Sequence, residues 1–111
     1  MKKPDILRNQ KDFDNLHRRG KSSGSKYVVL VCVKNHLTYN RKAFLASKKV
    51  GNSVMRNRAR RLMKAAFSEL EASLPVGYDL LFIARNTITD SKCADVKKSI
   101  EAAAKRAGLI R

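Results

Sequence analysis

Apolar side chains between residues 53 and 73 recur at every third or fourth position, the spacing that places them on one face of a helix. Asn52 or Ser53 can cap the start of this helix, and Pro75 stops it. The pattern predicts a long amphipathic helix over Ser53–Ser73, with an inner face made of Met55, Ala59, Leu62, Met63, Ala66, Phe67 and Leu70.

Two shorter helices are predicted near the ends of the chain. Gln10–Arg19 combines a helical spacing of apolar residues with basic residues in its last turn, and Gly20 follows where helices commonly stop. Lys92–Ala107 also has apolar residues on one face. One of residues 89–91 can cap its start, and Gly108 ends it.

Three runs rich in β-branched and aromatic residues predict strands over Lys26–Lys34, Lys42–Lys49 and Tyr78–Arg85. The first run is apolar at both parities, so either both of its faces are covered or one face lies open to a ligand. Because a short turn separates the first two strands, we expect them to form a hairpin. The small polar residues 20–25 predict a flexible loop before the first strand.

The order of these elements, αββαβα, indicates the fold class. The long helix separates the second strand from the third, a connection that predicts parallel pairing of those two strands. A chain of 111 residues is long enough for one compact unit. We therefore expect an α+β fold in one domain over residues 1–111, with a small mixed sheet and helices packed on it.

The net charge of the chain limits the classes of function that it can have. Lys and Arg number 25 and Asp and Glu 9, a net charge of +16. Such an excess repels itself, which favours a polyanionic partner over a small-molecule substrate. The longest apolar run, Tyr27–Val33, is far shorter than the roughly 20 residues that span a membrane. Without a signal-peptide pattern or a CxxC motif around Cys32 and Cys93, we expect a reduced, cytoplasmic protein with no membrane contact.

Residues 48–64 carry seven of the 25 basic residues, and no acidic residue occurs between Asp14 and Glu69. A solvated helix face normally interleaves acids with bases, because a purely basic face repels itself. A bare solvated face remains the alternative, but the pattern favours contact with nucleic-acid phosphates, which Arg binds bidentately. At about 100° per residue, one arc of the helix gathers Asn57, Arg58, Arg60, Arg61 and Lys64, with Arg56 at its boundary.

This basic segment resembles the signature of the bacterial ribonuclease P protein component. The parts that carry the resemblance are Ser47-Lys48-Lys49-Val50-Gly51-Asn52, then Arg56-Asn57-Arg58, then Arg60, Arg61 and Lys64. The resemblance extends along nearly the whole chain. Lys11–Gly20 is similar to the family's first helix, Asp79–Arg85 to its third strand, and Ala107–Leu109 to the end of its last helix.

The resemblance implies both a fold and a role. The fold is αββαβα with a left-handed β-α-β crossover, although such crossovers are right-handed as a general rule. The role is that of the small protein subunit of a ribonucleoprotein whose catalytic RNA removes the 5′ leader from precursor tRNA. Mg²⁺ is held mainly by the RNA. The implied partners are the catalytic RNA and the precursor-tRNA leader, with no small-molecule substrate.

The resemblance also implies two sets of site residues. The RNA-facing set is Lys48, Lys49, Asn52, Arg56, Asn57, Arg58, Arg60, Arg61 and Lys64. A groove for the single-stranded leader would use Phe13, His17, Tyr27, Val29 and Val31, because bases stack on aromatic rings. His17 stands where many relatives have Phe or Tyr, and Val31 where some have Tyr. Instead of contacting the leader, Phe13 could simply pack in the core, and Tyr27 could cap an edge of the sheet.

The residues do not predict a protein nuclease. Such an enzyme needs a paired acid and base, or clustered carboxylates that hold a metal. His17 and His36 lie on different predicted elements and the acidic residues are scattered, so we expect no catalytic and no metal-binding side chain. Two other classes stay open: a ribosomal or other structural RNA-binding protein, and a DNA-binding protein that inserts the long helix into the major groove.

Overall fold

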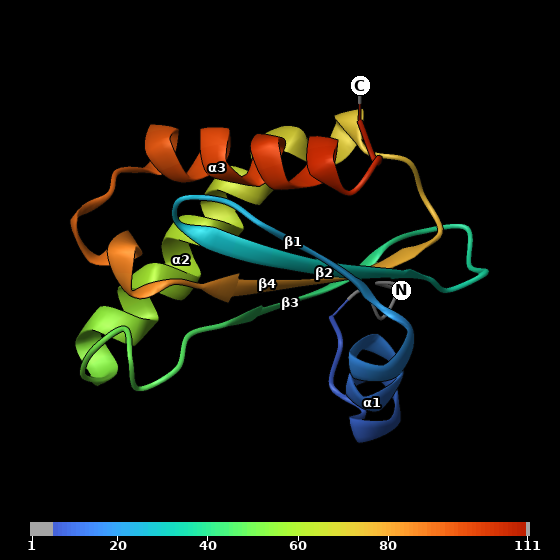
Figure 1. The fold of residues 1–111 in the computed structure, drawn as a ribbon, viewed down its shortest axis with the longest axis horizontal. Coiled ribbons are helices and arrows are strands. Elements are labelled where there is room, and N and C mark those ends of the chain that lie inside the picture. The colour runs from blue at the N-terminus through green and yellow to red at the C-terminus, as the bar shows by residue number, and fades with distance from the viewer. Residues whose placement is uncertain (1–5, 111) are drawn as a thin grey trace, which may run out of the picture.

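Residues 6–110 are the part of the chain that the computed structural model describes, and they form three helices, two 3-10 turns and a four-stranded sheet (Figure 1). All three predicted helices and all three predicted strands are confirmed. The long helix ends at Leu70 and the second predicted strand at Leu45, both earlier than expected. The elements are α1 (Gln10–Arg19), β1 (Lys21–Gly24), β2 (Val28–Lys34), β3 (Arg41–Leu45), α2 (Ser53–Leu70), η1 (Glu71–Ser73), β4 (Tyr78–Ala84), η2 (Asn86–Asp90) and α3 (Cys93–Arg106).

The prediction of a flexible loop over residues 20–25 is wrong. Lys21–Gly24 forms β1, an edge strand that pairs antiparallel with β2, from Lys21 opposite Cys32 to Gly24 opposite Val29. Strand β1 has no apolar side chain to mark it in the sequence. The pairing is made by backbone groups, which small polar residues offer as well as large apolar ones.

The predicted hairpin of the first two strands is also wrong. The strand order is β1-β2-β4-β3, so β4 lies between the two strands that were expected to pair. Strand β4 runs antiparallel to β2 and parallel to β3, and the predicted parallel pairing of β3 with β4 is therefore confirmed. Strand β4 suits the interior of the sheet because Leu80, Leu81 and Phe82 bury apolar side chains on both faces.

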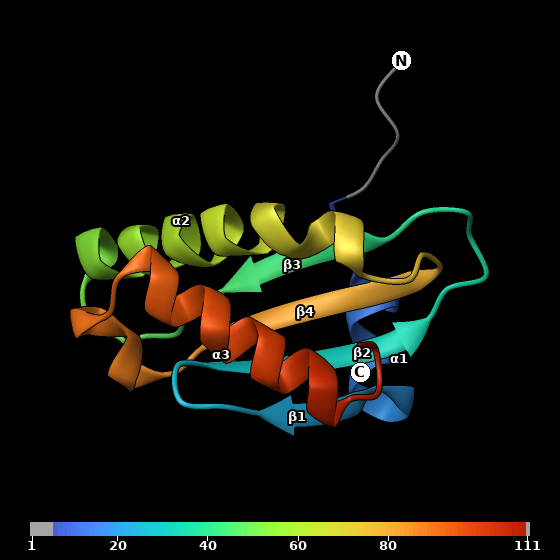
Figure 2. The ribbon, with the colours of Figure 1, turned by 90° about the horizontal axis from the view of Figure 1, so that it is seen from above.

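The connection from β3 through α2 to β4 has the left-handed sense that the resemblance implied. In Figure 2 the helices α2 and α3 lie on the viewer's side of the sheet, and β3 and β4 both run to the left. With these strands turned to point upward, the chain leaves β3, passes through α2 in front and re-enters the sheet on the left. Parallel crossovers are right-handed in nearly all proteins.

Helices α2 and α3 cover one face of the sheet. Three aromatic rings form the middle of this core, with ring centroids 5.0 Å apart for Phe67 and Phe82 and 5.4 Å apart for Phe44 and Phe82. Met63 from α2 and Ile100 from α3 close over them and are fully buried. This larger cluster accounts for most of the apolar area that the fold removes from water.

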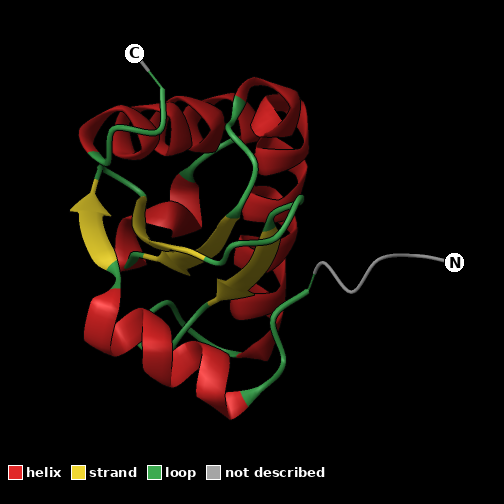
Figure 3. Cartoon of the chain, turned by 90° about the vertical axis from the view of Figure 1, so that its right-hand side faces the viewer, coloured by secondary structure: helices red, strands yellow, loops and turns green. Residues whose placement is uncertain are grey.

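The opposite face carries α1 and a smaller cluster. Figure 3 shows the sheet as a layer with one helix, α1, on its lower side and the other two on its upper side. Leu16 of α1 is fully buried against Val31 and Leu81 of the sheet, and Phe13 and Val29 pack at the margin. The residue that follows α1, Gly20, has no room for a side chain, because a Cβ there would run into the carbonyl oxygen of Leu16 and the side chain of Val31.

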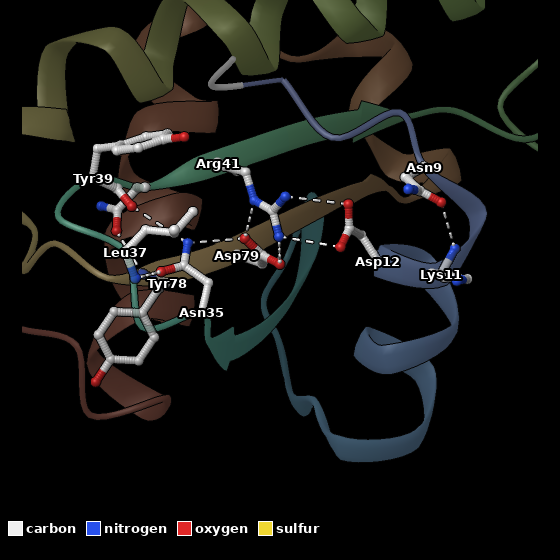
Figure 4. Close-up of polar contacts among 10 residues, drawn as sticks. Asn9, Lys11, Asp12, Asn35, Leu37, Tyr39, Arg41, Tyr78 and Asp79 are labelled. Carbon is white, nitrogen blue, oxygen red and sulfur yellow. Dashed lines mark hydrogen bonds and ion pairs between the residues drawn. The ribbon is translucent and has the colours of Figure 1, made fainter. Parts of the chain in front are cut away.

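An ion-pair network fixes α1 to the sheet (Figure 4). Arg41 of β3 donates two 2.8 Å hydrogen bonds to the carboxylate of Asp79 and two 3.2 Å bonds to the carboxylate of Asp12. Asp79 is only 2% exposed and also accepts a bond from Asn35. The bond to Asp79 raises the pKa of the Arg41 guanidinium, so this group stays charged. A single arginine thus connects α1, β3 and β4.

Candidate nucleic-acid interface

The basic helix α2 begins at a side-chain cap. The Oδ1 atom of Asn52 accepts a 3.0 Å bond from the backbone N–H of Met55, so of the two predicted caps it is Asn52 that serves. Gly51 before it has a φ of +145°, which favours glycine. The predicted contact residues Lys48 and Lys49 are exposed in the turn that leads into this cap. The start of α2 is therefore well fixed, with lysines beside it.

The predicted basic arc of α2 is present. Asn57, Arg58, Arg61 and Lys64 are exposed, and Arg56 and Arg60 are partly buried at its margins. Arg60 donates a hydrogen bond to the side chain of Asn57, which orients both groups. The side of the helix that packs on the core is apolar, and the cations therefore lie on the outer side.

Arg58 has a second, internal role that the sequence did not reveal. Its Nη1 atom donates to the backbone carbonyl of Thr89 at 3.1 Å, and its Nη2 atom donates to that of Ser91 at 2.9 Å. Both carbonyls lie in the segment that leads from η2 into α3. Arg58 therefore joins α2 to η2 and to the residue that follows it, whereas Arg61 forms no such bond with any of residues 6–110.

A cleft of about 430 Å³ lies over the open edge of β3. It brings Arg60, Arg61 and Lys64 of α2 to the same space as Phe13 of α1, which joins the two predicted site sets in one hollow. The other lining residues were not predicted from the sequence. They come from the segment before α1 and from β3: Ile6, Leu7, Arg8, Ala43, Phe44 and Leu45.

The backbone of β3 contributes to this cleft. The N–H of Leu7 bonds the carbonyl of Lys42 at 2.8 Å, so the peptide groups of Lys42 point away from β4 toward the free edge. Peptide directions alternate along a strand, and the N–H and C=O of Phe44 therefore point to that same edge. The cleft thus combines cations, aromatic rings and a strand edge.

The predicted leader-groove residues are not all together. Phe13, Val29 and Val31 pack on the α1 side of the sheet, and His17 is exposed one turn farther along α1. Tyr27 lies elsewhere: it precedes β2, and its ring packs against the cluster beneath α2 and α3. The alternation that grouped Tyr27 with Val29 and Val31 holds only inside the strand, which begins at Val28.

The described residues offer no metal site. Within residues 6–110, no three His, Cys, Asp or Glu side chains come close enough together to hold a metal ion. Free Cys32 is buried and free Cys93 is partly exposed. In the same range, no helix is long and apolar enough to cross a membrane.

The family model described as Ribonuclease P matches residues 1–108. The chain belongs to the ribonuclease P protein family. The ribonuclease P protein component of Pelotomaculum thermopropionicum is 40% identical over 111 residues, which covers 100% of this chain and 99% of the relative. That of Clostridium botulinum is 40% identical over 108 residues, or 96% and 97% of the two chains.

Solved structures of the ribonuclease P protein have the same fold. The Staphylococcus aureus protein superposes with a TM-score of 0.86 at 24% identity and covers 98% of this chain and 100% of its own. The Thermotoga maritima protein gives 0.81 at 26% identity, covering 91% and 96%. The family match and the shared fold together identify the chain as a ribonuclease P protein subunit, and α2 and the adjacent cleft are its candidate RNA-binding surfaces.

Proposed function

We propose that this ribonuclease P protein binds the catalytic RNA through the outer side of α2 and binds the single-stranded 5′ leader of precursor tRNA in the cleft beside it. The RNA performs the cleavage that gives the mature tRNA 5′ end. The observation that carries the proposal is the cleft itself, where Arg60, Arg61 and Lys64 meet Phe13.

The chemistry of the cleft matches a single RNA strand. Phosphates need cations along one wall, and α2 supplies them. Unpaired bases gain about 1–3 kcal/mol each by stacking on aromatic side chains, and the rings of Phe13 and Phe44 both line the hollow. The N–H and C=O groups of Phe44, which point to the outer edge of β3, add hydrogen-bonding partners for base edges or ribose hydroxyls.

The outer side of α2 supports the contact with the catalytic RNA. Its cations repel one another in the free protein, so phosphates that neutralise them turn this cost into a gain. The contact set is that predicted from the sequence, with Lys48 and Lys49 at its approach. If roughly six phosphates are engaged, the logarithm of affinity falls with the logarithm of salt concentration at a slope of about −5.

Mg²⁺ and catalysis are assigned to the RNA. The residues described do not fit a metal held by the protein, because they bring no set of suitable ligands together. His17 and His36 are both exposed, His17 on α1 and His36 in the loop after β2, so they form no acid–base pair. The protein contributes binding and positioning.

The test is cleavage of precursor tRNA by a bacterial ribonuclease P RNA at low Mg²⁺, with and without the protein. We expect strong stimulation, no cleavage by the protein alone, and a loss of stimulation in the Arg60→Ala/Arg61→Ala double variant. The matched control is Arg18→Ala/Arg19→Ala, which removes two exposed arginines from α1. Equal loss in both double variants would contradict a specific α2 contact.

The leader contact needs its own readout. Phe13→Ala should weaken binding of precursor tRNA by about tenfold, because one stacking interaction is worth 1–3 kcal/mol, and leave binding of mature tRNA by the holoenzyme unchanged. An equal effect on both substrates would refute the leader assignment. Binding of the catalytic RNA without any stimulation of cleavage would instead favour a structural RNA-binding protein.

A further inference from the structure

The turn between β1 and β2, residues 24–27, is held in place by donors from other parts of the chain. Each of its four carbonyl oxygens accepts a hydrogen bond, so the backbone of the turn is anchored at every residue. The donor and acceptor pairs are Arg106 Nη1 with Gly24 (2.9 Å), Arg85 Nη1 with Ser25 (2.8 Å), Thr87 Oγ1 with Lys26, and the N–H of Arg85 with Tyr27 (2.8 Å).

Ser99 holds the same turn from α3. Its hydroxyl oxygen accepts a 3.0 Å bond from the N–H of Tyr27 and forms a hydrogen bond with the hydroxyl of Ser25. Ser99 is 5% exposed in the middle of the helix. Buried polar contacts of this kind fix a loop in one arrangement, and a fixed loop loses little entropy when it binds a ligand.

Four cations surround this turn. Lys26, Arg85, Lys98 and Arg106 are all exposed, and we name them the turn cluster. Lys26 and Lys98 line a hollow of about 300 Å³ between the turn and α3. The one acidic residue that lines this hollow is Asp95, and its Oδ2 atom already accepts a 3.0 Å bond from the N–H of Lys92. Lys26 and Lys98 outnumber this one carboxylate, so positive charge predominates at the hollow.

The turn cluster is distant from the cleft beside α2. Figure 2 shows the β1–β2 turn on the β1 side of α3, whereas α2 lies over the β3 edge of the sheet. In the order β1-β2-β4-β3 the two edges are three strand spacings apart, or about 14 Å at roughly 4.8 Å each. The turn cluster and the cleft therefore lie toward opposite edges of the sheet.

We propose that the turn cluster is a second RNA-binding surface, which contacts the sugar–phosphate backbone of a segment other than the one bound by α2. A phosphate between Lys26 and Lys98 receives charge-assisted hydrogen bonds, and the spare N–H groups of Arg85 and Arg106 extend the contact along the backbone. The protein then bridges two RNA segments. This inference rests on the proposed RNA-binding function.

The experiment compares two double variants in the complex with a bacterial ribonuclease P RNA. Lys26→Ala/Lys98→Ala removes two cations of the turn cluster whose ammonium groups form no hydrogen bond or ion pair within residues 6–110. The ammonium of Lys26 lies 5.3 Å from the centroid of the Tyr27 ring. The control Lys11→Ala/Lys34→Ala removes two other exposed lysines. Affinity is measured over a range of salt concentrations, and hydroxyl-radical footprinting identifies the protected nucleotides. Melting temperatures of the free proteins verify that all variants fold.

We expect Lys26→Ala/Lys98→Ala to weaken RNA binding about tenfold and to reduce the salt slope by about two, since each phosphate contact contributes roughly 0.9. The control should change both values less. Footprints should lose protection at a segment distinct from the one lost in Arg60→Ala/Arg61→Ala. The proposal of a second surface would be refuted if affinity and salt slope equalled those of the control. It would also be refuted if Lys26→Ala/Lys98→Ala and Arg60→Ala/Arg61→Ala lost protection at the same nucleotides. If Arg60→Ala/Arg61→Ala alone has no effect, it is the proposed function of α2 that fails.

Discussion

The two faces of the sheet are built differently. On one face, α2 and α3 cover a continuous core in which Phe67 and Phe82 are almost completely buried. On the other face, α1 covers a smaller cluster around Leu16 and leaves Phe13 partly exposed at the cleft. The first face supplies the stability of the fold. The second retains an accessible surface because its helix is short and buries only a small apolar cluster, with an ion pair from Asp12 to Arg41 at the margin.

This difference explains how so basic a chain stays folded. Hydrophobic burial on the closed face offsets the repulsion among cations, which lie at the surface where water and salt screen them. The open face can then carry binding groups whose exposure costs stability. Substitutions in the closed core should therefore affect stability, whereas substitutions at the cleft and on the outer side of α2 should affect RNA binding.

The largest effect is expected on the closed face. Phe82→Ala removes a ring that is 0% exposed and in contact with two other aromatic rings, so it should lower the free energy of unfolding by about 3–5 kcal/mol. Phe13→Ala should cost clearly less, because its ring is partly exposed. Urea denaturation of both variants measures the difference. Equal losses would mean that both faces contribute equally to the core.

The next largest effect is expected at the network that fixes α1. Arg41→Ala leaves the buried carboxylate of Asp79 without its charged partner and should destabilise the protein by about 3 kcal/mol. It should also free α1, so amide hydrogen exchange should increase in Gln10–Arg19 more than in α2. A uniform increase over the chain would show that Arg41 stabilises the whole fold instead of holding the open face.

A smaller effect separates two arginines of the same helix. Arg58→Ala leaves two backbone carbonyls without their donor and should lower the free energy of unfolding by about 1–2 kcal/mol. Arg61→Ala should leave stability unchanged and weaken RNA binding. Thermal unfolding and RNA titration of the two variants provide the comparison. Destabilisation by Arg61→Ala of the same size would remove the distinction.

The smallest effect concerns the two cysteines. Cys32 lies in the closed face, and burial raises the pKa of its thiol above the ordinary 9.0, whereas Cys93 is partly exposed. The folded protein therefore holds the Cys32 proton more tightly than the unfolded chain does. This difference contributes to the free energy of unfolding in full below about pH 9, and the contribution is lost as the pH rises through the pKa of the folded state.

A thiol reagent at about pH 8 should label Cys93 in the folded protein and Cys32 only after unfolding, as mass spectrometry of the labelled peptides would show. Between about pH 8 and 10, Cys32→Ala should lose less stability than the parent protein. Labelling of both thiols at one rate in the native state would contradict a closed core.

The sequence was informative where side chains determine structure. The spacing of apolar residues predicted α2, and the cations on its outer side predicted the basic surface. Strand β1 was missed because its residues pair through the backbone. The position of β4 between β2 and β3 was missed because the local pattern of apolar and polar residues does not show which strands pair when they are far apart in the sequence.

The cleft could be predicted only in part. Its cations and Phe13 were identified from the motif and from α1, but residues 6–8 line it only because Leu7 bonds to the edge of β3. The bonds from Arg58 to the carbonyls of Thr89 and Ser91 likewise depend on tertiary structure. In the sequence, Arg58 and Arg61 are equivalent basic residues.

The central place of β4 also has a consequence for the order in which the fold can form. As the chain emerges during synthesis, β2 and β3 cannot pair with each other, because each is adjacent to β4 in the sheet. Both can be completed only after β4, which ends at Ala84, has been synthesised. Until then the sheet consists of the β1–β2 ribbon, and a two-stranded ribbon is marginally stable at best in water. A nascent chain that stops short of Ala84 should therefore remain sensitive to protease, and resistance should arise only once β4 and the helix that follows it are available.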